Sequence, residues 1–154
     1  MLIKSFEIES KLEIRHSKFM DSCLFCKIIT GQIQAYKIYE DDNAVAILDV
    51  HPRAPGHTMV LSKTHAENIL DLPNSDVGPV FTAVKKVAKK LKDVLNCDGL
   101  TIGINHGRVS GQLVDHLHIH VIPRWQDDGG KSIHSVVDNP SKETLEETYK
   151  KLKI

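Results

Sequence analysis

Three histidines at alternate positions constrain the fold of this chain more than any other feature of its sequence. The run reads His116, Leu117, His118, Ile119, His120, Val121 and Ile122. Strict alternation of polar and apolar residues predicts a half-buried β-strand. Because side chains alternate between the two faces of a strand that rises about 3.3 Å per residue, we expect the three imidazoles on one face, with neighbours about 6.6 Å apart. Imidazoles so placed can converge on one small anionic group or metal ion, whereas a purely structural role would leave several ring nitrogens without partners.

The charge balance argues against a broad attraction to polyanions. The chain has 154 residues, of which 41% are hydrophobic, and its 20 basic residues balance 20 acidic ones. This length and composition predict one domain with a substantial core. Without a net charge, binding to a polynucleotide or to an anionic membrane surface is disfavoured, so an anionic ligand must be bound by a local group of residues.

Neither a membrane partner nor export is expected. No apolar run approaches the roughly 18 residues of a membrane span, and the first 19 residues carry three glutamates among basic residues, a poor composition for a secretion signal or transit peptide. Two of the three cysteines form the pair Cys23-x-x-Cys26, which favours a metal or redox role over a structural disulfide. We expect a cytoplasmic protein, and nuclear entry is open to so small a chain.

The remaining sequence predicts an antiparallel α+β domain. Strands are expected at residues 36–39, 44–48, 57–61, 100–105 and 116–122. Apolar residues at three- and four-residue spacing predict one long helix over residues 77–95. Short helices are expected at residues 26–30, after a cap at Thr64, and beyond Pro140.

Three motifs together resemble the signature of the histidine-triad (HIT) superfamily. They are residues 105–107 (Asn-His-Gly), residues 111–112 (Gly-Gln) and the histidine run itself, and shorter upstream matches extend the resemblance over about residues 22–125. The resemblance implies a five-stranded antiparallel sheet with one long and several short helices, a homodimer, and nucleotidyl hydrolysis or transfer through a histidine nucleophile. We expect residues 1–20 to be a peripheral extension, residues 21–126 to be the HIT domain, and residues 127–154 to be a tail with a short helix in the same domain.

By this resemblance His118 is the nucleophile, with His120 and His57 completing the catalytic set. Chemistry supports the role, because a neutral imidazole can attack phosphorus, hold the nucleotidyl group covalently and then yield it to water. The resemblance also implies a set of nucleotide-binding residues that contact the phosphate, the ribose or the base. They are Asp49, Asn105, Gly111, Gln112, His118, His120, Phe25, Ile28, Ile38 and Val50. Taken without the resemblance, Asp49 is more typical of a turn or cap residue.

The cysteine pair supplies half of a tetrahedral zinc site. In zinc-bearing members of the superfamily the partners correspond to His65 and His116, so the resemblance implies a structural zinc bound by Cys23, Cys26, His65 and His116. The alternative is a pair of buried free cysteines that only pack. Cys97 has no evident partner, and packing is expected for it.

The favoured function is hydrolysis or transfer at purine nucleoside phosphoramidates through a nucleotidyl–His118 intermediate. Dinucleoside polyphosphate hydrolysis, a non-enzymatic nucleotide sensor or scaffold dimer, and a catalytic metal bound by the three alternating histidines are the alternatives. Mostly apolar base contacts predict weak discrimination between adenine and guanine. Leu113 stands where many superfamily members have serine or threonine, which leaves the leaving group undetermined. Trp125 is expected either to shape the mouth of the site or to pack.

Overall fold

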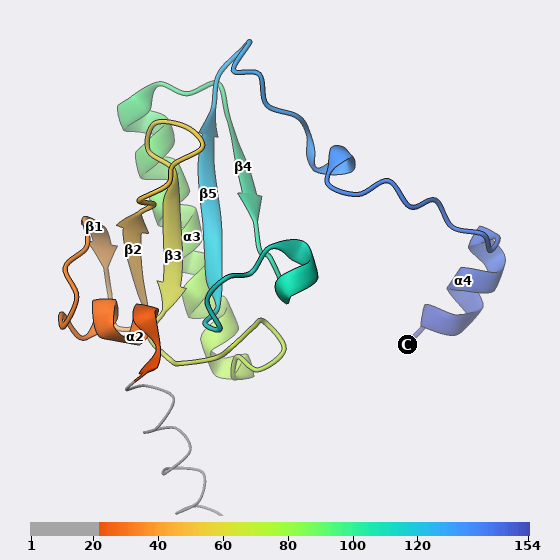
Figure 1. The fold of residues 1–154 in the computed structure, drawn as a ribbon, viewed down its shortest axis with the longest axis horizontal. Coiled ribbons are helices and arrows are strands. Elements are labelled where there is room, and N and C mark those ends of the chain that lie inside the picture. The colour runs from red at the N-terminus through yellow and green to blue at the C-terminus, as the bar shows by residue number, and fades with distance from the viewer. Residues whose placement is uncertain (1–21) are drawn as a thin grey trace, which may run out of the picture.

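One helix packed on a five-stranded antiparallel sheet makes up the body of the molecule (Figure 1). The structure is a computed structural model that describes residues 22–154; the expected extension at residues 1–20 lies outside them. The strand order is β1-β2-β3-β5-β4, and all four pairs of neighbouring strands are antiparallel, which confirms the predicted antiparallel α+β class. The elements are α2 (Leu24–Ile29), β1 (Lys37–Glu40), β2 (Ala44–Leu48), β3 (Thr58–Ser62), α3 (Asn74–Leu95), β4 (Gly99–Gly103), η1 (Arg108–Ser110), β5 (His118–Arg124), η2 (Ile133–Ser135) and α4 (Leu145–Leu152).

The main core lies between the sheet and α3. The apolar face of α3 packs Val80, Val84 and Val87 against alternate residues of the central strands, including Ile119 and Val121, which are 0% exposed. The three- and four-residue spacing that predicted this helix is therefore the spacing of its buried face. The helix begins at Asn74, three residues before the predicted start.

A smaller core lies on the opposite face of the sheet, under α2. Phe25 and Ile28 of α2 pack there against apolar side chains of β2 and β3, among them Val45, Met59 and Leu61. The face opposite α3 is therefore apolar on the β1–β2 side of the sheet. The first side chains that β5 adds to this same face are the imidazoles of His118 and His120.

Strand pairing determines which β5 side chains reach that face. His118 pairs with Leu61 and His120 pairs with Met59, so both imidazoles share the face of these residues. Their neighbours Ile119 and Val121 enter the α3 core. The alternation that predicted a half-buried strand is confirmed for His118–Arg124.

Two local predictions are wrong. The strand begins at His118, so His116 lies before it. No helix forms around His65: residues 63–72 are irregular, and the hydroxyl of Thr64 donates to a carboxylate oxygen of Asp76 at the start of α3. Thr64 therefore ties this loop to α3 instead of capping a helix of its own.

The tail leaves the end of β5 and extends away from the body (Figure 1). The helix predicted after Pro140 is α4, whose start is stabilised by a capping box between Thr144 and Glu147. None of the helices in residues 22–154 has the length and apolar character needed to cross a membrane.

We expect Gly56→Ala to destabilise the fold more than Gly31→Ala. Both glycines have a positive φ, +77° at Gly56 and +80° at Gly31, which costs any other residue about 1–2 kcal/mol. A Cβ at Gly56 would also overlap Leu95 of α3, whereas nothing lies within 4 Å of one at Gly31. Overpacking adds about 1–3 kcal/mol. Urea unfolding of both variants measures the difference, and equal losses would contradict this packing.

Candidate functional site

The structure divides the site residues into two adjacent clusters. Asp49, His57 and His120 form a histidine cluster beside His118. The second is a Cys–His cluster whose members are Cys23, Cys26, His65 and His116. The expectation that all three alternating histidines converge on one ligand is therefore wrong, because the Nδ1 of His116 faces the cysteines.

A backbone hydrogen bond determines which nitrogen of His118 carries its proton. The Nδ1 of His118 lies 2.7 Å from the carbonyl oxygen of His116. Since a carbonyl only accepts, Nδ1 donates, and in the neutral ring the lone pair is left on Nε2. The ring is 6% exposed and has the edge of Phe25 against it, with ring centroids 5.1 Å apart. An oriented imidazole with an unused Nε2 lone pair can act as a nucleophile.

A chain of hydrogen bonds similarly determines the tautomers of His57 and His120. The backbone N–H of Arg53 donates to His57 Nδ1 at 3.2 Å. His57 therefore carries its proton on Nε2 and donates it to His120 Nδ1 at 2.9 Å. As a result His120 presents an Nε2–H, which can donate to a phosphoryl oxygen. A carboxylate oxygen of Asp49 is 3.6 Å from His57 Nδ1, too far for a hydrogen bond that would reverse this order.

Burial keeps both rings of this chain uncharged at neutral pH. Burial lowers the pKa of His120 to about 4, helped by the neighbouring rings of His118 and His57. The pKa of His57 is lowered chiefly by burial and also by the Arg53 guanidinium, while the Asp49 carboxylate opposes the shift. Neutral rings are what the hydrogen-bond chain requires, because a proton on His57 Nδ1 would oppose the N–H of Arg53.

The Asp49 carboxylate is held at the end of β2. Its Oδ1 accepts the backbone N–H of His51 at 2.8 Å, the turn contact typical of an aspartate in this position. Of the four apolar residues expected around a base, Phe25 and Ile28 are buried in the smaller core, and Ile38 and Val50 are exposed. The exposed pair can give a ligand broad apolar contact, whereas Phe25 and Ile28, at 5% and 7% exposed, can give it only a small part of their surface.

The loop before β5 uses the Gln112 side chain for its own structure. The amide oxygen of Gln112 accepts the N–H of Gly107 at 2.8 Å, and its amide nitrogen donates to the carbonyls of Glu67 and Val114. The N–H of Gly111 likewise donates within the loop, to the carbonyl of Arg108. Sequence reasoning assigned these two residues to a ligand and missed their role in the loop, for which the sequence carries no signal.

Asn105 remains available for a ligand. The Asn105 side chain lies against the loop at Gly111: a Cβ added to Gly111 would be 3.6 Å from the Asn105 amide nitrogen. It makes no side-chain hydrogen bond within residues 22–154, and it is partly exposed. A partly exposed amide without a partner can donate to an anionic oxygen.

The Cys–His cluster fits a tetrahedral zinc ion. Its four donor atoms lie within 4.8 Å of one another. Three sulfur–nitrogen separations and the separation of the two histidine Nδ1 atoms are 3.3–3.5 Å. Zn–S bonds of about 2.3 Å and Zn–N bonds of about 2.0 Å place tetrahedral ligands at about these separations. His116 Nε2 donates to the carbonyl of Ser62 at 2.8 Å, which leaves Nδ1 free to bind a metal. Burial raises the pKa of the Cys26 thiol to about 12, so metal binding must displace its proton.

The comparisons with known proteins agree with this architecture. The HIT domain family matches residues 30–127. The uncharacterized HIT-like protein MJ0866 of Methanocaldococcus jannaschii is 42% identical over 131 residues, which cover 85% of this chain and 98% of that protein. The adenosine 5′-monophosphoramidase HNT1 of Candida albicans is 32% identical over 136 residues, or 86% of this chain and 90% of that protein. The crystal structure of a Zn-bound histidine triad family protein from Mycobacterium smegmatis is 39% identical, with a TM-score of 0.67 over 71% of this chain and 79% of that chain.

Zinc analysis by mass spectrometry tests the Cys–His cluster. We expect about one zinc ion per chain, and Cys26→Ser to lose most of it and to lower Tm by about 10 °C, because binding energy at a structural site is folding energy. Cys97→Ala is the matched control, since Cys97 is also buried but belongs to neither cluster. Equal zinc contents in the Cys26→Ser and control proteins would contradict the assignment.

Stability should fall as the pH falls from about 6.5 towards 4, in part because of His120. The unfolded ring binds a proton near pH 6.5, whereas the folded ring resists it until about pH 4, so acid favours unfolding within this interval. His120→Asn removes this contribution and leaves the Cys–His cluster intact. The free energy of unfolding of His120→Asn should therefore vary less steeply with pH than that of the wild type, and the two slopes should differ by up to about 1.4 kcal/mol per pH unit. Identical slopes in urea titrations of the two proteins would contradict a neutral His120.

Proposed function

The chain belongs to the HIT domain family, and from this premise we propose that it hydrolyses nucleotides at the α-phosphorus through His118. The substrates proposed are purine nucleoside 5′-phosphoramidates, whose P–N bond is broken with formation of a nucleotidyl–histidine intermediate. The observation that carries the proposal is the hydrogen bond from His118 Nδ1 to the His116 carbonyl, which leaves Nε2 unprotonated. The relatedness to a Candida albicans monophosphoramidase supports the choice of substrate.

The first step is attack of the His118 Nε2 lone pair on phosphorus. An Nε2–P bond forms and the P–N bond breaks, and the leaving nitrogen keeps the electron pair and takes a proton from water. The Nδ1–H of His118 stays on the His116 carbonyl, which accommodates the charge that the ring gains. Splitting one displacement into two lowers the barrier to each.

The second step returns the enzyme to its starting state. A water molecule attacks the phosphorus, the P–Nε2 bond breaks, and the electron pair returns to His118. The proton of the attacking water neutralises the hydroxide left by the first step, so the sum is phosphoramidate plus water giving a nucleoside monophosphate and an amine. His120 donates its Nε2–H to a phosphoryl oxygen in both steps, and His57 is the residue that holds this tautomer.

The rest of the site positions the nucleotide. In the proposal, the Asp49 carboxylate accepts hydrogen bonds from the ribose hydroxyls. The hydrogen bond from the His51 N–H, which holds this carboxylate in place, supports the role. Asn105 and the loop at Gly111 and Gln112 surround the phosphate. The base lies against the apolar residues of the β1–β2 side, which are Phe25, Ile28, Ile38 and Val50. Apolar contacts of this kind favour a purine without selecting strongly between adenine and guanine.

Zinc and a second copy of the chain complete the proposal. Zinc bound to Cys23, Cys26, His65 and His116 would tie α2 and the loop at His65 to the start of β5, and it supplies structure without a part in the reaction. A homodimer is supported by β4, an edge strand with exposed Ile102, because an unpaired strand edge is a ready site for pairing. The HIT domain is proposed to span residues 21–126, with the tail attached to it.

Two alternatives remain beside this proposal, and sequence similarity alone does not separate them. A dinucleoside polyphosphate hydrolase would use the same His118 chemistry on a larger substrate. A nucleotide sensor or scaffold would bind nucleotide without turnover. A metal held by all three alternating histidines is not proposed, because His116 faces the cysteines.

We predict that His118→Ala lowers AMP release from adenosine 5′-phosphoramidate by at least about 10³-fold, since the nucleophile itself is removed. His134→Ala is the control, because His134 lies in the tail, outside both clusters. Intact-protein mass spectrometry after a rapid quench without acid should detect an AMP adduct in the wild type and control only. Turnover by His118→Ala within tenfold of wild type would exclude His118 as nucleophile. Tight nucleotide binding by the wild type with neither adduct nor turnover would favour the sensor.

A further inference from the structure

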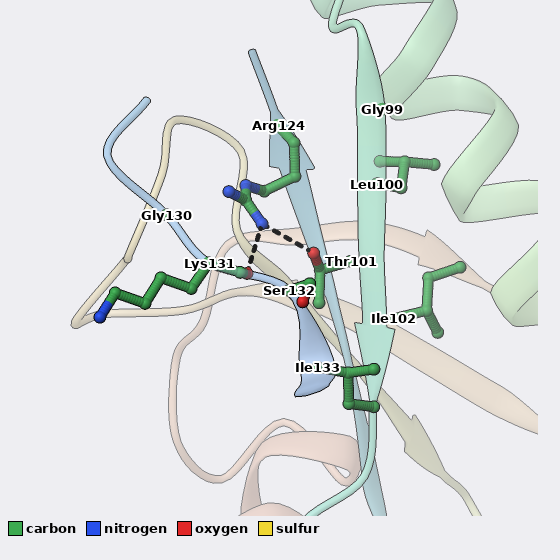
Figure 2. Close-up of a pocket in the computed structure, with 9 residues that line it drawn as sticks. All are labelled: Gly99, Leu100, Thr101, Ile102, Arg124, Gly130, Lys131, Ser132 and Ile133. Carbon is green, nitrogen blue, oxygen red and sulfur yellow. Dashed lines mark hydrogen bonds between the residues drawn. The ribbon is translucent and has the colours of Figure 1, made fainter. Parts of the chain in front are cut away.

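A hollow of about 310 Å³ lies at the far end of β5, and its lining includes Ile122, two residues beyond His120. Its lining includes Arg53, Thr101, Ile122, Trp125 and Lys131. A second hollow, of about 510 Å³, lies beside it along β4 and shares Thr101 and Lys131 with it (Figure 2). The proposed reaction uses no side chain of either hollow; of their residues only Arg53 takes part, through its backbone N–H.

Strand register places the first hollow on the side of His57 away from Asp49. Thr58 pairs with Val121, so His57 is level with Ile122, and Ile122 pairs with Thr101. On the other side of His57, the N–H of Asp49 donates to the His57 carbonyl. His57 thus separates the residue proposed to bind ribose from the hollow. Along β5, the hollow comes directly after His118 and His120, because Ile122 is the next residue on their face.

The hollow has an excess of positive charge. Arg124 and Asp128 also line it, and they neutralise each other in a two-pronged ion pair: Nε and Nη2 of Arg124 donate to the two carboxylate oxygens. Arg53 and Lys131 are left unneutralised, since neither side chain forms an ion pair in the part of the chain that the structure describes. Figure 2 shows the Lys131 side chain extending away from β4 while the Arg124 guanidinium lies against Thr101.

Arg53 lies close to His57, the ring that orients His120. Its guanidinium contributes to the lowered pKa of His57, and its backbone N–H donates to that same ring. Ile122 and Trp125 supply apolar surface to the lining of the hollow. The hollow therefore offers apolar contact for a short chain and two cations for its end.

We propose that this hollow binds the leaving group and that Arg53 and Lys131 select leaving groups that carry an anionic group such as a carboxylate. This inference rests on the proposed function. An in-line displacement at phosphorus requires the nucleoside and the leaving group to occupy different places, and the nucleoside is proposed to lie on the Asp49 side. Leu113, the residue that left the leaving group undetermined, is apolar and 78% exposed, so it cannot select a leaving group by charge. Arg53 and Lys131 can.

Three adenosine 5′-phosphoramidates of equal reach test the preference. Their amines are 4-aminobutyrate, its methyl ester and 1,4-diaminobutane, so the P–N bond is constant and the charge at the far end is negative, zero or positive. Each exposed ion pair contributes only a small amount, but the two cations attract the charged end of the anionic substrate and repel that of the cationic one, so their effects add in the ratio. We expect kcat/KM for the anionic substrate to exceed that for the cationic one by about tenfold at low ionic strength, and salt to reduce the ratio.

The double variant Arg53→Gln with Lys131→Gln should bring the ratio to within about twofold. Neither substitution removes the backbone N–H that holds His57. Lys89→Gln is the matched control, because it removes one charge from α3, on the opposite face of the sheet, where Lys89 pairs with Asp93; its ratio should equal that of the wild type. Equal kcat/KM for the three substrates, or an unchanged ratio in the double variant, would overturn the inference while leaving the proposed function standing. Hydrolysis of adenosine 5′-phosphoramidate but of none of the three would likewise overturn the inference alone, whereas hydrolysis of none of the four would refute the proposed function, and this inference with it.

Discussion

The pairing of β5 with β3 determines where every group of the histidine cluster lies. Because side chains alternate with period two, a slip of one residue would place Ile119 and Val121 at the site and bury the imidazoles of His118 and His120 under α3. Burial of Ile119 and Val121 in the α3 core opposes that slip, since each would lose about 1.5–3 kcal/mol of burial free energy. Packing of the core therefore maintains the strand register that places His118 and His120 at the site.

Backbone groups then determine the protonation of each ring. The carbonyl of His116 places a proton on Nδ1 of His118, and the N–H of Arg53 places the proton of His57 on Nε2. His116 in turn has Nε2 on the carbonyl of Ser62 and Nδ1 towards the cysteines. Alternate histidines of one short segment thus carry different tautomers, and a zinc ion at the Cys–His cluster would stabilise the same backbone that orients the proposed nucleophile.

Local pattern was enough to predict the sheet, the long helix and the α4 segment, because each is defined by periodic burial or by capping residues. It was not enough for His116, whose ring orientation depends on Cys23 and Cys26, about 90 residues away in the chain. The loop role of Gln112 and the part of Arg53 depend on backbone partners, and no side-chain pattern in the sequence encodes such partners. The four residues of the Cys–His cluster were brought together as one proposed zinc site only through the resemblance to a family.

The central claim is that the proton of neutral His118 is on Nδ1, so that Nε2 is free to attack phosphorus. Nitrogen-15 NMR of protein labelled at histidine distinguishes protonated from unprotonated ring nitrogens, and His118→Gln assigns the resonances by difference. For the neutral rings we expect a protonated Nδ1 and an unprotonated Nε2 in His118, with the opposite arrangement in His57. A His118 ring with its proton on Nε2 would contradict the account, because its lone pair would then face the His116 carbonyl.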